Sequence, residues 1–448
     1  MNMEEKDWGR LSPDQKREAL FEAWLSPEGM EFNTPEAEKA YRERVARIRD
    51  AALLRKPDRV PVCPMIGFFP AYYSGFTPQE VMYDYDKLVS AYKKYALDFE
   101  PDAHGGALSP GPGRFFEILD YKLYAWPGHG VAPEYSYQCL EGEYMREDEY
   151  DALIQDPSNY FMSTYLPRIF KSLEPMHKLS PLTNILEMYS AFSAINFIPF
   201  GMPDVQEALR KLMEAGNEAV KWMEYVQTHN RQVTAAGFPT FFGGGTKAPF
   251  DIIGDTLRGT RGIMMDMFRR PEKILKAVEV LTPLAVKMGV SAARRNGNPI
   301  IFIPLHKGAD GFMSDEQFKK FYWPSLREVI LGLVEEGCVP LPWAEGGYNS
   351  RLDVIRDVPE GKVIWGFDQT DMVEARKKLE GIACVGGNMP IDLLSIATPE
   401  QVRDYARKLV EEVAGDGGYI MMTGAVMDEV KPENVRAMIE TVKEFGVY

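Results

Sequence analysis

The first 56 residues contain two segments whose apolar side chains recur at the spacing of an α-helix. Ser12–Pro13 followed by Gln15 is typical of a helix start, because a capping serine, a first-turn proline and a returning glutamine satisfy free backbone N–H groups. The apolar stripe that follows consists of Leu20, Phe21, Trp24 and Leu25. A second helix is predicted from Thr34–Pro35 to Lys56–Pro57. We therefore expect residues 1–56 to form a helical extension.

From residue 57 the pattern changes to apolar runs of strand length that alternate with helical segments. The predicted strands are 59–65, 238–244, 299–305, 338–344, 362–367, 382–387 and 418–423. The clearest helices are predicted at 204–236, 315–336, 371–380 and 432–445. Strands that are apolar almost throughout, and that alternate with helices, pair in parallel and are covered on both faces.

Seven predicted strands come close to the eight of a (β/α)8 barrel, a TIM-type α/β fold. The main alternative is an open, doubly wound sheet that binds a dinucleotide. That fold is disfavoured because no G-x-G-x-x-G follows a strand, and Gly243-Gly244-Gly245 has the wrong spacing. We expect one barrel domain over residues 57–448.

Charge, cysteine content and hydropathy exclude several classes of protein and of binding partner. The 448 residues include 51 Lys+Arg and 66 Asp+Glu, which gives a net charge of −15 and argues against nucleic acid or an anionic membrane as a partner. The four cysteines are too few and too scattered for a disulfide framework, and because they form no C-x-x-C pair a cysteine-built zinc ribbon is not expected either. The first residues contain no apolar leader and no long apolar run occurs, which predicts a cytoplasmic protein.

In a barrel of this kind the active site lies at the carboxyl ends of the strands. Polar residues that follow predicted strands are therefore the candidates for chemistry. They are His306 and Asp310, Glu345, Asp368, Asn388, and near the start of the chain Asp102 and His104.

Each candidate also has a structural interpretation. Asp368 precedes a helix and resembles a cap, while Asn388 before Met389–Pro390 resembles a turn residue. Glu345 lies between Trp343 and a pair of glycines, so it either faces a pocket or is a buried ion-pair partner of Arg351 or Lys307. We regard Glu345 and His306 as the leading candidates for catalytic residues.

Four segments together resemble the uroporphyrinogen decarboxylase superfamily. They are RVPVCPMIGFFPAYYSG, ADGFMSDEQFKKFYWPSLREVI, VGGNMPIDLLSIATPEQV and the closing VKPENVRAMIETV. The resemblance implies a distorted (β/α)8 barrel and, by default, a homodimer. It also implies one of two activities, since the superfamily contains porphyrinogen decarboxylases and methyltransferases that serve corrinoid proteins in anaerobic metabolism.

The residues favour the methyltransferase branch. The decarboxylases carry two arginines after the first strand to bind a polycarboxylate, whereas Met65 is followed here by Ile66-Gly67-Phe68-Phe69-Pro70. The methyltransferases typically bind zinc through a His-x-Cys pair, which falls here on Trp343 and Glu345, and through a late Cys near Ala425. A thiol-activating zinc site is therefore not expected. A zinc site of harder donors, formed by Glu345, His306 and Asp310, remains the expectation.

The resulting hypothesis is a methyltransferase that moves a methyl group from a methoxylated aromatic donor to a partner corrinoid (cobalamin) protein, as in O-demethylation. The residues expected to bind substrate are Phe68, Phe69, Tyr72, His104, Trp343, Asp368 and Asn388. Two alternatives remain open at this point. One is a carboxy-lyase acting on a carboxylated ring, with Asp102 or His104 as the acid, and the other is a non-catalytic tetrapyrrole or corrinoid carrier.

Overall fold

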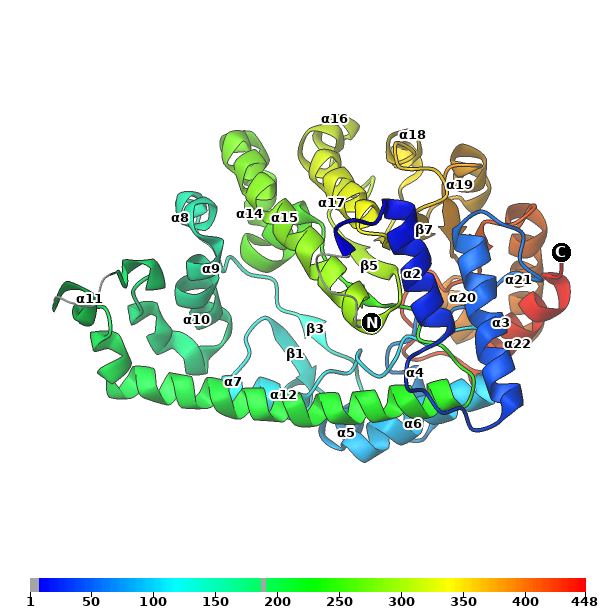
Figure 1. Ribbon diagram of the computed structural model, residues 1–448, viewed down its shortest axis with the longest axis horizontal. Helices are drawn as coiled ribbons and strands as arrows, with labels where there is room; N and C mark the ends of the chain where they lie inside the picture. Colours follow the sequence, from blue (N-terminus) through cyan, green and yellow to red (C-terminus); the bar gives the residue numbers. More distant parts are fainter. Residues whose placement is uncertain (1–7, 187–190) are drawn as a thin grey trace.

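The computed structural model describes residues 8–186 and 191–448. Six strands form one parallel sheet at its centre (Figure 1). These are β4 (Gly244–Gly245), β5 (Ile300–Leu305), β6 (Val339–Ala344), β7 (Ile364–Phe367), β8 (Cys384–Gly386) and β9 (Tyr419–Ile420). The longest ladder joins β5 to β6, with Ile300 opposite Val339 and Leu305 opposite Ala344.

Two further extended segments, 60–63 and 102–104, close this sheet into a ring. The Cys63 N–H donates to the Met421 carbonyl at the end of β9, at 2.9 Å. The Asp102 N–H donates to the Val62 carbonyl at 2.9 Å, and the Phe241 N–H donates to the His104 carbonyl at 2.9 Å. Hydrogen bonds therefore join eight parallel segments in a circle, which confirms the predicted (β/α)8 barrel.

One helix follows each barrel segment along the chain. These helices are α6 (Tyr85–Phe99), α12 (Pro203–Ala235), α15 (Pro271–Asn296), α17 (Trp323–Glu335), α18 (Leu352–Ile355), α19 (Met372–Leu379), α21 (Pro399–Val413) and α22 (Pro432–Phe445). Side-chain caps fix the starts of several of them. At α21, for example, Thr398 and Gln401 form a reciprocal capping box.

Shorter helical turns lie between the strands and their helices, on the side where the strands end. They are α4 (Phe69–Tyr73), α5 (Pro78–Tyr83), α13 (Pro249–Asp251), η5 (Ile252–Leu257), α14 (Gly259–Arg269), α16 (Asp315–Gln317), η6 (Phe318–Tyr322), η7 (Asn349–Arg351) and α20 (Ile391–Ile396). The single helix predicted over 315–336 is thus divided into α16, the π-helical turn η6 and α17. Pro324 has no N–H to continue a regular α-helical ladder, which accounts for the wider turn before it.

A long insertion, residues 105–202, separates the second barrel segment from its helix α12. Its strands are β1 (Tyr124–Pro127), β2 (Gly130–Val131) and β3 (Gln138–Cys139), and we call residues 124–139 the flap. Its helical pieces are α7 (Gly113–Leu119), α8 (Tyr150–Gln155), α9 (Pro157–Tyr160), η1 (Phe161–Tyr165), α10 (Leu166–Ile169), η2 (Lys171–Lys178), η3 (Leu182–Asn184), α11 (Ala191–Ile195) and η4 (Ile198–Gly201). Because it follows a strand end, this insertion starts on the face of the barrel where active sites are built.

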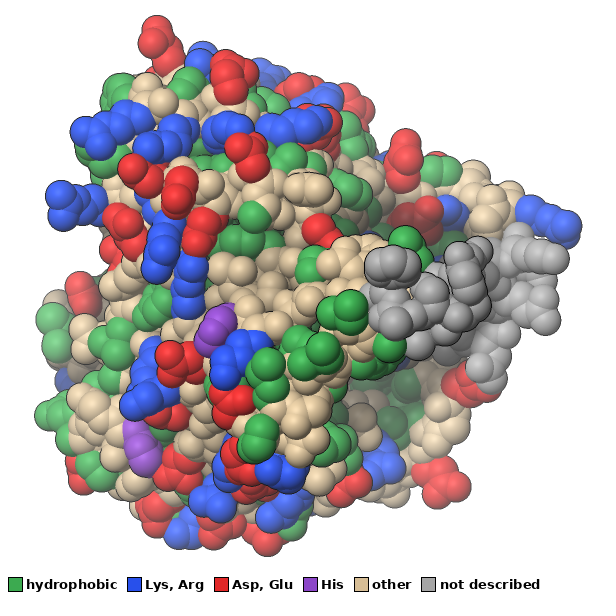
Figure 2. Space-filling model, turned by 90° about the vertical axis from the view of Figure 1, so that its left-hand side faces the viewer, with side chains coloured by type: hydrophobic (Ala, Val, Ile, Leu, Met, Phe, Trp, Pro, Cys, Tyr) green, Lys and Arg blue, Asp and Glu red, His purple; other side chains and the backbone are tan. Residues whose placement is uncertain are grey.

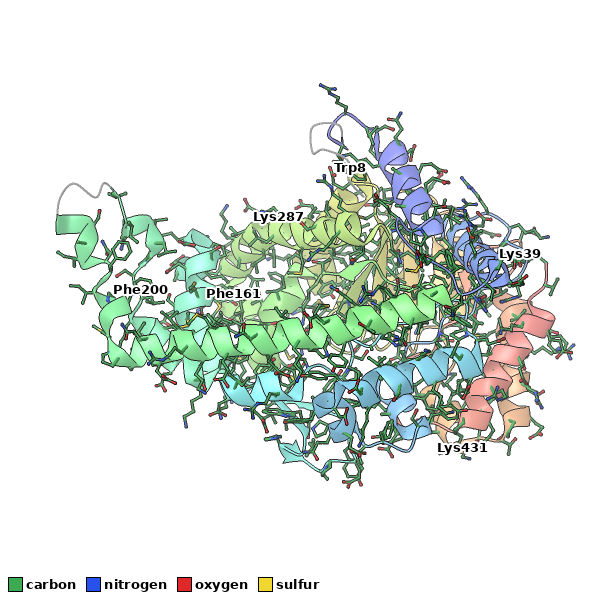
Figure 3. The ribbon with its side chains drawn as sticks, turned by 60° about the horizontal axis from the view of Figure 1, so that its bottom comes forward. Trp8, Lys39, Phe161, Phe200, Lys287 and Lys431 are labelled. Carbon is green, nitrogen blue, oxygen red and sulfur yellow. The ribbon has the colours of Figure 1, made fainter. Side chains whose placement is uncertain are left out.

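The pieces from α8 to η4 form an arm that projects beside the barrel. Figures 1 and 3 show that the 33-residue helix α12 runs from the arm, which contains Phe161 and Phe200, back along the barrel. Apolar side chains are exposed near the end of the arm, including Leu186, Ile195 and Ile198. Figure 2 shows apolar side chains beside interspersed acidic and basic ones on this face.

The N-terminal helices α2 (Pro13–Leu25) and α3 (Pro35–Ala52) pack against the barrel interior. Phe21 and Trp24 belong to the same buried cluster as Ile300, Ile364 and Cys384 from three barrel strands. The indole N–H of Trp8 also donates to Glu336 at 2.8 Å, beyond the end of α17. The helices predicted for residues 1–56 are present, although α3 ends at Ala52 rather than at Lys56. None of the described helices combines the length and apolar character that crossing a bilayer requires.

Barrel packing gives one testable prediction on stability. A Cβ added at Gly366 in β7 would lie 2.3 Å from Cε3 of the Trp343 ring, whereas one added at Gly216 in α12 meets no atom within 4 Å. Gly366→Ala should therefore lower the free energy of unfolding by about 1–3 kcal/mol. The matched control Gly216→Ala should raise it by about 0.5–1 kcal/mol, because alanine has the higher helix propensity. Urea unfolding measures both values, and equal effects at the two sites would contradict the packing argument.

Candidate active site at the barrel mouth

The carboxyl ends of the strands bring together polar side chains that are far apart in the sequence. His306 follows β5, Glu345 follows β6, Asp368 follows β7 and Asn388 follows β8. Asp428 follows β9, and its carboxylate accepts a 2.6 Å hydrogen bond from the backbone N–H of residue 68 after the first segment. These side chains surround the mouth of the barrel.

His306 is held between two carboxylates. Its Nδ1 lies 2.5 Å from Asp255 in η5, and its Nε2 lies 3.4 Å from Glu345. Burial by itself would lower the pKa of His306, but hydrogen bonds and charge from Asp255 and Glu345 outweigh it and raise the pKa to about 10. With a carboxylate at each ring nitrogen, the side chain is an imidazolium, and each of its two N–H groups points to one of these carboxylates.

Asp255 is the anchor of this arrangement. Lys247 lies 2.8 Å from its carboxylate and Lys307 lies 3.4 Å from it, so two cations besides His306 neutralise it. Burial would raise the pKa of Asp255, but the His306 hydrogen bond and the Lys247 charge hold that pKa below its usual value. Asp255 therefore stays ionised and keeps His306 protonated.

A second buried carboxyl group, Asp251, fixes the backbone that carries His306. It accepts hydrogen bonds from the N–H groups of His306 and Lys307, both at 3.0 Å, and from the Tyr322 hydroxyl at 2.7 Å. Burial and the neighbouring charge of Asp255 raise the pKa of Asp251. Its role is to position the loop after β5.

Glu345, Asp368 and Asn388 form the opposite side of the mouth. The Glu345 side chain is 50% exposed, and it is not the buried partner of Arg351 or Lys307 that the structural interpretation required. Asp368 accepts from the Gly346 N–H at 3.0 Å, and burial followed by the charge of Glu345 raises its pKa. The Asn388 amide donates to the Asp368 and Thr370 carbonyls, and its Oδ1 has no hydrogen-bond partner among the described residues.

The four aromatic residues expected to bind substrate are buried or half-buried. Phe69 packs among Tyr73, Tyr95 and Phe99 in the core. Trp343 is 2% exposed and fills the barrel interior, while Phe68 is 1% exposed and touches the flap through its ring edge. Tyr72 is half-buried, and its hydroxyl donates to the Glu134 carbonyl at 2.5 Å.

The acids proposed for a lyase, Asp102 and His104, also lie away from the mouth. Asp102 begins its barrel segment and is fully buried, with ion pairs of 2.6 Å to Arg47 and 2.7 Å to Arg59. Burial would raise the pKa of Asp102, but these arginines hold it below its usual value. His104 is 2% exposed, accepts from the Gly106 N–H and packs against His229, and burial lowers its pKa far below the usual range. Neither group is placed to protonate a ligand at the mouth.

Zinc does not fit the residues at the mouth. The carboxylate of Asp310 accepts from the Ser350 hydroxyl at 3.0 Å and lies 3.6 Å from Arg351, so it does not join Glu345 and His306. Both nitrogens of His306 already face carboxylates. Across residues 8–186 and 191–448, no three His, Cys, Asp or Glu side chains are placed to hold one ion. The expected ligand set of Glu345, His306 and Asp310 is corrected accordingly.

Sequence reasoning missed Asp251, Asp255 and Lys247. They follow β4, which contains only Gly244 and Gly245. Two glycines are not an apolar run, so the sequence marks the end of this strand poorly. The one available indication was the position rule itself, because all three residues lie between the predicted strand 238–244 and the next helix of the barrel.

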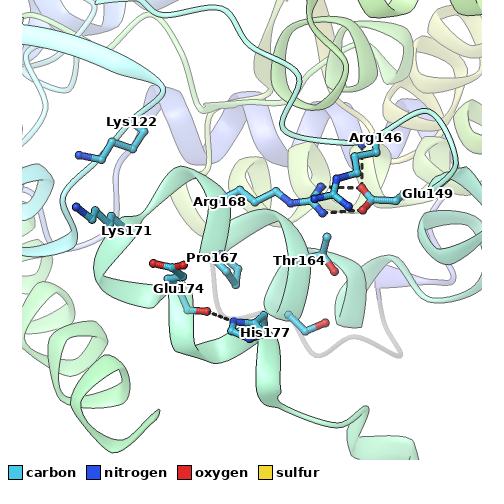
Figure 4. A pocket seen from close by; sticks show the side chains of 10 residues that line it. Lys122, Arg146, Glu149, Thr164, Pro167, Arg168, Lys171, Glu174 and His177 are labelled. Atoms are coloured by element: carbon cyan, nitrogen blue, oxygen red, sulfur yellow. Dashed lines mark hydrogen bonds and ion pairs between the residues drawn. The ribbon is translucent and has the colours of Figure 1, made fainter. Parts of the chain in front are cut away.

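A surface cavity of about 700 Å³ lies on the arm and not at the mouth (Figure 4). Some of its charged groups already have ion-pair partners. Arg168 binds Glu149 through two hydrogen bonds of 2.6 and 2.7 Å, and Lys122 pairs with Asp120. The mouth is the better candidate for catalysis, because His306 lies there between two carboxylates at the carboxyl ends of the strands, where βα-barrels build their active sites.

Comparison with known proteins agrees with this architecture. The family model described as uroporphyrinogen decarboxylase (URO-D) matches residues 197–445, which is more than half of the chain. The chain belongs to the URO-D family. The match includes the barrel from β4 to α22, and with it His306, Glu345, Asp368 and Asn388.

Curated relatives in the URO-D family are distant. A uroporphyrinogen decarboxylase of Methylococcus capsulatus is 28% identical over 207 residues, covering 45% of this chain and 57% of the relative. One of Chlorobium phaeobacteroides is 25% identical over 161 residues, covering 33% of this chain and 45% of the relative. The chain thus matches only about half the length of these relatives.

A solved structure extends the likeness to almost the whole fold. A methyltransferase from Methanosarcina mazei aligns over 89% of this chain and 98% of its own, with a TM-score of 0.56 and 14% sequence identity. At this identity the similarity concerns the fold.

The His306 arrangement gives a direct prediction. Asp255→Asn removes the charge next to Nδ1, so the pKa of His306 should fall from about 10 toward its ordinary value of 6.5. NMR titration of the imidazole ring protons measures this shift. The matched control is Asp310→Asn, since Asp310 bonds to Ser350 and not to His306, and it should leave the pKa unchanged. An unchanged pKa in Asp255→Asn would show that Asp255 does not control the ring.

Proposed function

We propose that this URO-D family protein is a methyltransferase that transfers a methyl group from a small methoxylated aromatic donor to a separate corrinoid protein. The observation that carries the proposal is the imidazolium of His306, fixed at the mouth between Asp255 and Glu345. Both arginines that the decarboxylases carry after the first strand are absent, and Ile66 and Pro70 stand in their places, which argues against a polycarboxylate substrate.

The chemistry needs an acid at the ether oxygen. An aryl methyl ether reacts slowly with a nucleophile because phenolate is a poor leaving group. In the proposed reaction the nucleophilic Co(I) of the acceptor bonds to the methyl carbon, the C–O bond breaks, and the oxygen takes the proton from Nε2 of His306. A phenol has a pKa of about 10, so an imidazolium whose pKa is about 10 is matched to the oxygen it protonates.

The other residues would support this proton transfer. Asp255 keeps the ring charged before reaction and holds it in place afterwards. Glu345 and Asp368 face the mouth and could return a proton from solvent to His306 for the next turnover. The proposal places the protein in the cytoplasm, where a reduced corrinoid partner is available.

Glu345→Gln tests the role of the half-exposed carboxylate. The fold should be kept, because an ion pair this exposed contributes at most about 1 kcal/mol to stability. Methyl transfer should fall by about 10²-fold, the usual scale for losing an acid–base group. The assay mixes the protein with a reduced corrinoid protein and methoxyarenes and follows methylcobalamin absorbance, with Glu380→Gln on an exposed helix end as control. Full activity in folded Glu345→Gln protein would remove Glu345 from the site.

The pH profile tests the acid separately. Because the reaction needs the protonated ring, the rate of methyl transfer should hold to high pH and fall only as the pH rises through about 10. In Asp255→Asn the fall should begin near neutral pH. Release of CO2 from carboxylated rings, or stoichiometric capture of a coloured tetrapyrrole without turnover, would instead support the lyase or the carrier function.

A further inference from the structure

A small aromatic cavity lies beside the mouth, between the flap and the loop after the second barrel segment. Its volume is about 220 Å³. The residues lining it are Ser109, Pro110, Gly111, Phe116, Tyr121, Tyr124, Trp126 and Tyr137. Five of these eight residues are aromatic and none is charged. We call this cavity the flap pocket.

Two contacts join the flap pocket to the end of the first barrel segment. The Tyr137 ring meets Phe68 edge to face, with centroids 6.0 Å apart. The Ser109 hydroxyl donates to the Ile66 carbonyl at 3.1 Å. The pocket therefore adjoins the mouth on the side where Asp428 also lies.

A third connection reaches the His306 loop on the other side. Tyr124 of β1 is paired with Cys139 of β3, and the chain just after β3 carries Glu141. Glu141 lies 3.4 Å from Lys307, the residue after His306, and it also accepts a 2.8 Å hydrogen bond from the Thr260 N–H. The flap is thus held across the mouth from the first barrel segment to the loop after β5.

We propose that the flap pocket holds the aromatic ring of the methyl donor and selects uncharged methoxyarenes over methoxybenzoates and over methylated cations. This inference rests on the proposed methyl transfer, which it deepens by naming the pocket that holds the ring and by restricting the donor to uncharged rings. The sequence did not indicate this pocket. None of the aromatic residues expected to bind substrate lines it, and two of them, Phe69 and Trp343, are buried.

Size and rigidity fit one ring. An apolar cavity of about 150 Å³ accommodates benzene, and pockets for drug-sized ligands begin at about 300 Å³, so 220 Å³ suits a single substituted ring. The walls also hold one another in place. Tyr124 and Tyr137 are edge to face at 5.5 Å, and Phe116 is in contact with both Tyr121 and Trp126. A pre-formed aromatic cavity binds a flat ring with little loss of side-chain freedom.

Charge disfavours an anionic ring. A carboxylate in the pocket would find no cation in its lining. Partial burial of its ring raises the pKa of Tyr137, and the negative charges of Asp428 and Glu345 raise it further, so these carboxylates also act electrostatically on the pocket. Lys307 and Lys247 cannot compensate readily, since Asp255 and Glu141 already bind them.

A methylated cation is the competing ligand, because aromatic cages bind quaternary ammonium groups. The reacting group at the mouth, however, is the imidazolium of His306, which repels a cation. A quaternary nitrogen also has no lone pair that could accept the proton of the imidazolium. A neutral ether oxygen accepts the Nε2–H hydrogen bond. The arrangement therefore favours the uncharged ether.

Calorimetric binding to the full chain, without any corrinoid protein, tests the inference. The probes are 2-methoxyphenol, 4-methoxybenzoate and phenyltrimethylammonium. Wild type should bind 2-methoxyphenol about 10-fold or more tightly than either charged probe. Tyr137→Ala should weaken 2-methoxyphenol binding about 10-fold, whereas Tyr137→Phe should retain it, because the ring and not the hydroxyl forms the wall.

The matched control is Tyr135→Ala. Tyr135 lies in the same flap and is 58% exposed, but it does not line the pocket, so its removal should leave binding unchanged. Tyr137 is itself 46% exposed, which makes Tyr137→Ala compatible with folding; melting temperature checks this, and Tyr137→Leu serves as the second variant.

The outcomes separate this inference from the proposed function. Tighter binding of either charged probe, no binding of 2-methoxyphenol, or equal effects of Tyr137→Ala and Tyr135→Ala would overturn the pocket assignment. Binding as expected with no methyl transfer to any corrinoid protein would overturn the proposed function and leave the pocket intact. Methyl transfer with KM unaffected by Tyr137→Ala would retain the function and overturn the pocket.

Discussion

The hydrogen bonds between the first and last barrel segments are the constraint on which the rest of the structure depends. When Cys63 binds the carbonyl of Met421, the sheet closes and all eight strand ends face one opening. Residues separated by hundreds of positions, such as Phe68 and Asp428, then become neighbours. Interior packing reinforces the closure, since Gly366 leaves the space that the Trp343 ring fills.

Closure of the barrel by itself would give a mouth lined by polar loops. The largely buried carboxylates of Asp251 and Asp255 add a fixed and charged histidine to that mouth. Asp251 binds the backbone of the β5 loop, and Asp255 binds the His306 ring. Their surroundings push their pKa values in opposite directions, because Asp255 has three cations at its oxygens while Asp251 has neutral donors and a charged neighbour. The ionised Asp255, together with Glu345, keeps His306 charged at neutral pH, which is the property that a proton-donating group requires.

The insertion after the second segment adds what the barrel lacks. The barrel interior is filled by side chains, so a ligand must be enclosed by loops above the strand ends. The flap supplies a second wall of aromatic rings, held to the barrel through Phe68 on one side and through Glu141 with Lys307 on the other. The proposed site therefore lies between the barrel and its own insertion.

The sequence by itself determined the fold class, the helix starts and two of the central residues. Local rules suffice for these features: capping boxes at Ser12 and Thr398 act within four residues, apolar runs mark buried parallel strands, and strand ends point to His306 and Glu345. Tertiary structure alone decided that Asp255, and not Asp310, is the partner of His306, and that Phe69 and Trp343 are buried while Tyr137 lies at a pocket. The physical reason is that register, burial and side-chain direction depend on contacts between distant segments, which the local order of residues does not encode.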